Sequence, residues 1–129
     1  MFIQKLSKSQ QSIFLTLANE LMSVDGDIST KEVALLDFYK SQMEGDVKPS
    51  AYEPSAICGL FENKTSKIAM LLELIGLGHA DGDYDNEEQS FIRKLARMIE
   101  LDDSDVQQCE SWVSKQIALI SEANSMMEV

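Results

Sequence analysis

Five carboxylates lie within eight residues in the segment Asp81-Gly82-Asp83-Tyr84-Asp85-Asn86-Glu87-Glu88, and their types and spacing could do chemistry. Carboxylates this close repel one another, and a bound cation would relieve that repulsion. Hard oxygen ligands suit Ca²⁺ or Mg²⁺. Asp81, Asp83, Asp85 and Glu88 are therefore candidate ligands for a divalent cation.

A second copy of this segment lies 56 residues earlier, as Asp25-Gly26-Asp27-Ile28-Ser29-Thr30-Lys31-Glu32. The two segments align without a gap. The earlier copy has Ser29 where the later one has Asp85, and Lys31 adds a positive charge. Asp25, Asp27 and Glu32 therefore form the weaker candidate cation site.

The same residues also have a purely structural interpretation. Ser29 with Glu32, and Asp85 with Glu88, have the spacing of capping boxes at helix N-termini, where each side chain bonds to the other residue's backbone N–H. Glycine after aspartate is typical of a helix end. Capping and cation binding both remain open at this point.

A calcium-binding EF-hand loop is not a match. That loop requires oxygen ligands at positions 1, 3 and 5, glycine at position 6 and glutamate at position 12. With Gly82 at position 6, Leu77 falls at position 1. With Asp81 at position 1, Asn86 falls at position 6 and Ile92 at position 12. Neither register gives a complete loop.

Other catalytic constellations are not visible in the sequence. His79 is the one histidine, and its place at a helix C-terminus favours a structural role. Cys58 and Cys109 are far apart in the sequence, which favours buried free thiols. No serine or cysteine stands beside a base, and there is no glycine-rich phosphate loop. We therefore expect a protein that is not an enzyme.

Apolar side chains recur every three or four residues, which predicts an all-α fold. We expect one domain over residues 1–129, built from two pseudo-symmetric helix–Asp-Gly–helix hairpins. The hairpins should span about 9–43 and 65–100, with a loop at 44–54, a short helix within 56–62 and a C-terminal helix at about 104–124.

The apolar stripes of these helices should meet in one core. Val33, Leu36 and Tyr39 mark the stripe of the second helix, and Ile28 with Val33 occupies the positions of a hydrophobic staple. Ser104 and Gln107 have capping-box spacing at the start of the last helix. Its stripe comprises Val106, Cys109, Val113, Ile117 and Ile120.

The net charge of −11 repels nucleic acids and anionic membranes, and it favours cations or basic protein surfaces. No apolar stretch is long enough to span a bilayer, and the N-terminus does not resemble a signal peptide. We expect a cytoplasmic protein with protein partners, no nucleic acid and no direct membrane insertion.

The segment from His79 to Glu88 resembles the signature of TerB-like tellurite-resistance proteins, and Ser23 to Glu32 resembles the first copy in that family. The same hairpin resembles the N-terminal domain of certain membrane-anchored J-domain co-chaperones. The resemblance implies a two-fold pseudo-symmetric helical bundle, a bacterial stress context, and an acidic cluster proposed to bind divalent cations.

Three functions are compatible with these patterns. The first is a non-enzymatic TerB-like stress-response module that binds protein partners. The second is a divalent-cation-binding protein that uses the acidic loop at residues 81–88. The third is a small metal-dependent enzyme.

Overall fold

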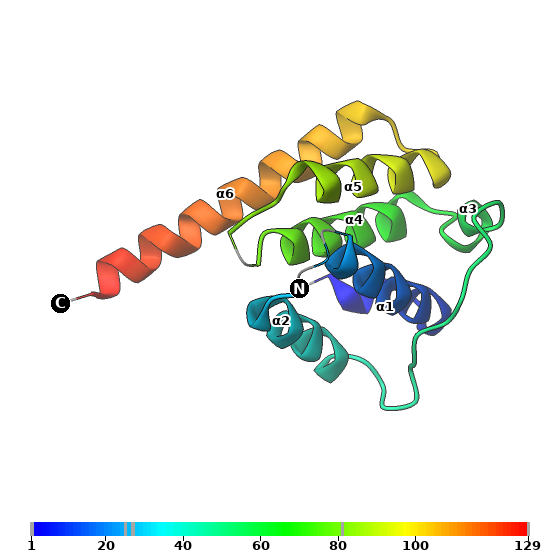
Figure 1. Ribbon diagram of the computed structural model, residues 1–129, viewed down its shortest axis with the longest axis horizontal. Helices are drawn as coiled ribbons and strands as arrows, with labels where there is room; N and C mark the ends of the chain where they lie inside the picture. Colours follow the sequence, from blue (N-terminus) through cyan, green and yellow to red (C-terminus); the bar gives the residue numbers. More distant parts are fainter. Residues whose placement is uncertain (1, 25, 27, 81, 129) are drawn as a thin grey trace.

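The computed structural model describes residues 2–24, 26, 28–80 and 82–128, and about 71% of these residues are helical, with no strand among them. The all-α prediction is therefore confirmed. A short 3₁₀ helix and six α-helices follow one another along the described chain (Figure 1): η1 (Ile3–Lys5), α1 (Lys8–Ser23), α2 (Thr30–Ser41), α3 (Ile57–Leu60), α4 (Lys64–Gly78), α5 (Asn86–Met98) and α6 (Asp103–Met127).

Helix α4 is the centre of the bundle. It contacts η1, α1, α2, α5 and α6. Leucine, isoleucine and methionine occupy several of its faces, as expected for a helix enclosed by others. Met70, Leu71, Leu74, Ile75 and Leu77 are fully buried. The remaining helices therefore take their positions from the apolar surface of α4.

Side-chain caps mark the starts of the long helices. Ser7 and Gln10 form a capping box at α1, and Asn63 caps α4. The predicted box of Ser104 and Gln107 at the last helix is wrong, because Asp102 and Asp105 form it instead. Leu101 is buried immediately before this helix, so the chain turns from the core into α6 two residues earlier than predicted.

Two predicted apolar stripes are only partly buried. Leu36 and Tyr39 of α2 lie in the core, whereas Val33 and the preceding Ile28 are 45% and 52% exposed. In α6, Val106, Cys109 and Val113 are buried, but the stripe beyond them is not. The expectation of full burial was therefore wrong for both helices, and in α6 the reason is that its C-terminal part projects beyond the bundle (Figure 1).

The predicted loop at 44–54 contains no helix, and the predicted short helix after it is α3. The loop is attached to α1, because the Ser50 N–H donates to the Ser12 carbonyl oxygen at 3.2 Å and the Thr16 hydroxyl donates to the Ser50 carbonyl oxygen at 2.7 Å. Among the described residues, no helix has the length and apolar character needed to cross a membrane.

Candidate functional site

The two Asp-Gly turns have the same backbone geometry at their glycines. Gly26 has φ +81° and Gly82 has φ +85°, a region that other residues adopt only with strain. The Gly26 N–H donates to the Ser23 carbonyl oxygen at 3.1 Å, and the Gly82 N–H donates to the His79 carbonyl oxygen at 2.9 Å. Each glycine thus ends its helix as the sequence predicts.

Both predicted capping boxes are present at the helices that follow. The Ser29 N–H donates to Glu32 Oε1 at 3.0 Å, and the Asp85 N–H donates to Glu88 Oε1 at 3.1 Å. In return, the Glu32 N–H donates to Ser29 Oγ at 3.1 Å and the Glu88 N–H donates to Asp85 Oδ1 at 2.9 Å. Both glutamates are only 2% exposed. Capping therefore accounts for one carboxylate oxygen of each glutamate.

This arrangement engages some of the candidate cation ligands in capping and leaves another exposed. Asp85 and Glu88 are engaged in capping, whereas Asp83 lies on the surface. Asp25, Asp27 and Asp81 lie outside the described residues. Within the described part of the chain, no three histidine, cysteine, aspartate or glutamate side chains are grouped closely enough to hold a metal ion. The cation site therefore stays a prediction.

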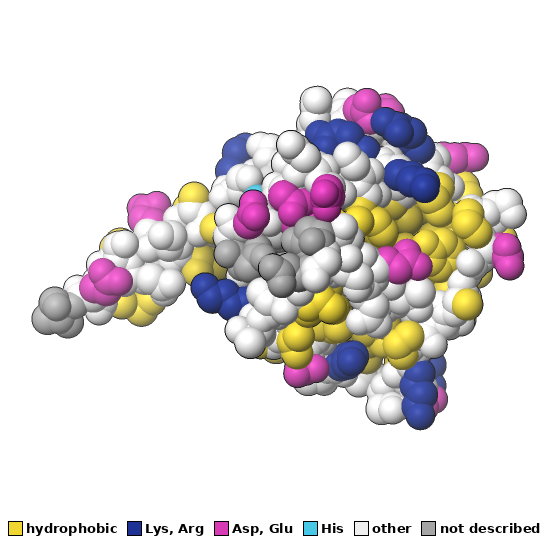
Figure 2. Space-filling view, viewed as in Figure 1, with side chains coloured by type: hydrophobic (Ala, Val, Ile, Leu, Met, Phe, Trp, Pro, Cys, Tyr) yellow, Lys and Arg dark blue, Asp and Glu magenta, His cyan; other side chains and the backbone are white. Residues whose placement is uncertain are grey.

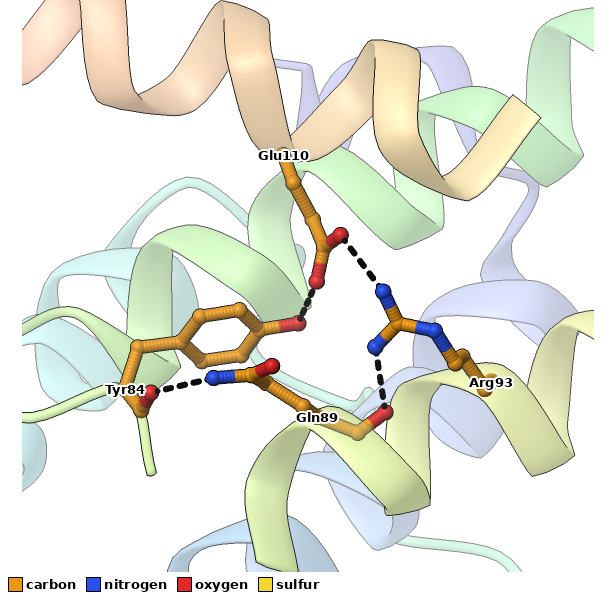
Figure 3. Close-up of polar contacts among 4 residues, drawn as sticks. All are labelled: Tyr84, Gln89, Arg93 and Glu110. Atoms are coloured by element: carbon orange, nitrogen blue, oxygen red, sulfur yellow. Dashed lines mark hydrogen bonds and ion pairs between the residues drawn. The ribbon is translucent and has the colours of Figure 1, made fainter. Parts of the chain in front are cut away.

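A network of polar side chains joins the second loop to α5 and α6 (Figure 3). The Tyr84 hydroxyl donates to Glu110 Oε2 at 2.7 Å, and Arg93 Nη2 pairs with Glu110 Oε1 at 3.1 Å. Gln89 Nε2 donates to the Tyr84 carbonyl oxygen at 2.9 Å. Burial, together with the acceptor carboxylate of Glu110, raises the pKa of Tyr84. The network positions the loop on a helix that is distant in sequence.

Gly78 makes room for the Tyr84 ring. A Cβ atom at Gly78 would lie 2.8 Å from Tyr84 Cδ1, closer than such contacts allow. The His79 ring lies beside Tyr84, with ring centroids 4.6 Å apart. Burial lowers the pKa of His79. The structural role of His79 stays a prediction, and the sequence patterns did not single out Gly78, Tyr84, Arg93 or Glu110.

The family match covers this second loop. Residues 44–111, more than half of the 129 residues, match the family described as tellurite resistance protein TerB. The chain belongs to the TerB family. The matched region contains the whole Tyr84–Glu110 network, whereas the first Asp-Gly turn lies before it. Comparison with curated proteins gives no significant match, and comparison with solved structures gives none either.

The ends of the two TerB hairpins lie close together. Val24, at the end of α1, shares a surface depression of about 450 Å³ with Asn86 and Glu87 at the start of α5. Phe91 and Lys94 also line this depression, and both continue into a second one of about 230 Å³ beside Leu17 and Tyr52. The two depressions share Phe91 and Lys94 on the surface between α1 and α5, and together they are here called the α1–α5 groove.

Hydrophobic surface follows the α1–α5 groove, with acidic side chains beside it (Figure 2). Tyr52 forms part of the wall, and its hydroxyl donates to Glu20 Oε2 at 2.8 Å. Glu20 and Glu87 are exposed at the two ends, and Lys94 lies between them. The groove therefore combines an apolar floor with carboxylates at its rim, beside the Asp-Gly turns.

Proposed function

We propose that this chain is a non-enzymatic TerB-family module that acts in the bacterial cytoplasm, in a stress response, by binding a protein partner. The observation that carries the proposal is the α1–α5 groove, an apolar surface depression that reaches Asn86 and Glu87 of the second Asp-Gly loop. Concave apolar surface with a few polar groups at its rim is typical of binding sites. The family description supports the stress context.

The charges around the groove indicate the chemistry of the partner. Glu20 and Glu87 at its ends belong to a chain with a net charge of −11. Complementary charge speeds association and selects between partners. The proposed partner therefore presents an apolar segment, such as one face of a helix, flanked by lysine or arginine.

The environments of the reactive side chains support a non-enzymatic role. Burial raises the pKa of the Cys109 thiol to about 11, so this cysteine is a poor nucleophile at neutral pH. The His79 ring lies against Tyr84, and its backbone N–H is bonded within the last turn of α4. Neither residue has the nucleophile–base arrangement that hydrolytic catalysis requires.

Site-specific photocrosslinking in cells that naturally produce this chain tests the proposal. A photoreactive phenylalanine analogue at Phe91 should give one dominant adduct with another protein, because Phe91 lies where the two depressions join. The same analogue at Gln107, an exposed residue of α6 that lines neither depression, is the control. No adduct at position 91, or the same adducts at both positions, would contradict the proposal.

A divalent-cation site on the second loop is the second candidate function. It is favoured by the exposure of Asp83 and Glu87 beside the capping pair of that loop. The proposed ligands are Asp81 and Asp83, with Asp85 or Glu88 completing the site. The first loop has two fewer carboxylates and adds Lys31, so its site should be weaker by orders of magnitude.

Calorimetric titration with Ca²⁺ and with Mg²⁺ distinguishes cation binding from capping alone. If the second loop binds a cation, Asp83→Asn should weaken binding at least about tenfold, because a charged oxygen ligand is lost. Asp27→Asn, the equivalent change in the first loop, should leave the affinity unchanged. Absence of binding by the wild type, or a larger loss with Asp27→Asn, would contradict this candidate.

A further inference from the structure

The distal half of α6, defined as residues 114–127, carries a broad apolar face and projects from the bundle (Figure 1). Ile117, Ile120 and Met127 are 43%, 54% and 70% exposed, and they continue the stripe that is buried nearer the start of α6. At 100° per residue, Leu119 and Met126 widen this stripe to about half of the helix circumference, and they are 65% and 75% exposed. The other half of the circumference carries polar side chains such as Ser121, Glu122 and Ser125. An apolar face this wide is normally packed against other protein.

An apolar groove lies beside this half-helix. It has a volume of about 520 Å³ and is formed by α2, α4 and α6. Phe38 of α2 and Leu72 of α4 contribute to its walls, and Gly76 contributes a position without a side chain. Glu73 is its one charged residue among those described. This α2–α4–α6 groove is distinct from the α1–α5 groove, so the inference does not depend on the proposed function.

The exposed area is consistent with an interface of ordinary size. The accessible surface of the chain is 7420 Å², whereas a compact monomer of 14.4 kDa exposes about 6,800 Å². The surplus is about 600 Å², close to the roughly 800 Å² that each partner buries in a stable complex. Packing of the projecting half-helix against a partner would return the exposed area to the range of a compact protein.

The charge distribution favours a second copy of the chain as that partner. The distal half carries one lysine, Lys115, and one glutamate, Glu122, so its net charge is zero in a chain of net charge −11. A basic partner would be attracted to the acidic surfaces elsewhere rather than to this one. Two identical acidic chains repel each other least where each is neutral, and this segment meets that condition.

The sequence of α6 is also suited to pairing with itself. A two-fold axis beside Ile120 would pair Val113 with Met127 of the partner subunit and Ile117 with Ala123 of the partner subunit. Gln116 would face Asn124 of the partner subunit in the same way. In a two-fold interface, each residue pair occurs twice with the two copies exchanged, and these pairs satisfy that requirement.

We propose that this chain forms a homodimer in which the two α6 helices run antiparallel, with the distal half of each in the α2–α4–α6 groove of the other copy. The antiparallel direction follows from the position of the groove, which lies along residues 113–120 of α6 and not along the end of the helix. Parallel helices would leave residues 121–127 of both copies beyond both grooves. In the antiparallel pair, each half-helix contacts α6 on one side and α2 on another, which would cover its broad apolar face.

Sedimentation velocity over a range of concentrations tests the dimer with the full chain. The wild type should shift with concentration from 14.4 kDa to twice that mass. Ile120→Asp should weaken the dimer at least about tenfold, because it places two carboxylates together at the two-fold axis. Ile120 is 54% exposed in the single chain, so this variant should retain the circular dichroism spectrum and thermal midpoint of the monomer.

Ser121→Asp is the matched control, because it adds the same charge one residue later, about 100° around the helix and away from the paired face. It should dimerise nearly as well as the wild type. A monomeric wild type, or equal weakening by both variants, would overturn the proposal. Neither outcome would affect the crosslink expected at Phe91, so the dimer and the proposed function are tested separately.

Discussion

Glu32 and Glu88 are buried acidic residues at equivalent places in the two hairpins, and each completes a capping box. A buried carboxylate is costly unless it is hydrogen-bonded, and the backbone N–H at the start of the helix supplies such a bond. Glutamine can make the same bond, as Gln10 does at α1, where it accepts from the Ser7 N–H at 2.9 Å. A comparison of glutamine with glutamate at this position therefore distinguishes the contribution of the hydrogen bond from that of the negative charge.

Glu32→Gln and Glu32→Ala provide this comparison in the first hairpin. We expect Glu32→Gln to change the free energy of unfolding by less than about 0.5 kcal/mol and Glu32→Ala to lower it by about 1–2 kcal/mol, because only alanine removes the acceptor. Urea unfolding followed by circular dichroism measures both. An equal loss in the two variants would show that the charge, rather than the cap, is what this position requires.

At the scale of the element, α6 has two parts with different surroundings. Its first part contributes Val106, Cys109 and Val113 to the core, and Glu110 to the network with Tyr84. Its second part has the same spacing of apolar residues, but Ile117 and Ile120 are largely exposed. The apolar spacing does not change at Val113, so the change in exposure comes from the surroundings of the helix.

Truncation of the chain tests this division. Removal of residues 119–129 should lower the free energy of unfolding by less than about 1 kcal/mol, since every core residue of α6 is retained. Removal of residues 111–129 also deletes Val113, which is 2% exposed, and should cost about 2–4 kcal/mol. Urea unfolding, extrapolated to low protein concentration, measures both. Equal losses would show that the distal half stabilises the single chain.

At the scale of the whole molecule, the chain has 22 acidic and 11 basic residues. The repulsion within this net negative charge destabilises the folded state. The ion pairs of Lys8 with Glu44 and Asp46 lie on the surface, where such pairs contribute little. Self-repulsion is therefore spread over the whole chain. It should respond to screening by salt more than to any single substitution.

Sodium chloride should raise the thermal midpoint by about 2–5 °C between 0.01 M and 0.3 M, because the Debye length falls from about 30 Å to about 6 Å over that range. The rise should then level off, since further screening changes little. Thermal unfolding followed by circular dichroism at each salt concentration measures it. A midpoint that is constant below 0.3 M and rises only at molar salt would point to a general salting-out effect instead.

The α-helices, their order and the capping boxes that follow the two Asp-Gly turns could be predicted from the sequence, because apolar periodicity and caps depend on residues close together in the chain. Ser29 with Glu32 and Asp85 with Glu88 are each three residues apart, so their bonds depend on local geometry alone. The TerB resemblance was also visible locally, in the residues around each Asp-Gly turn. These features depend on residues close together in the chain and not on tertiary packing.

Only the tertiary structure decided which of these residues meet. Tyr84 and Glu110 are 26 residues apart, and nothing in the sequence around either residue indicates their bond. Whether Ile117 and Ile120 are buried depends on where the neighbouring helices end, so a continuous apolar stripe could not show that half of α6 leaves the bundle. The two grooves likewise arise between helices distant in sequence, because the shape of a surface depends on all the elements that enclose it.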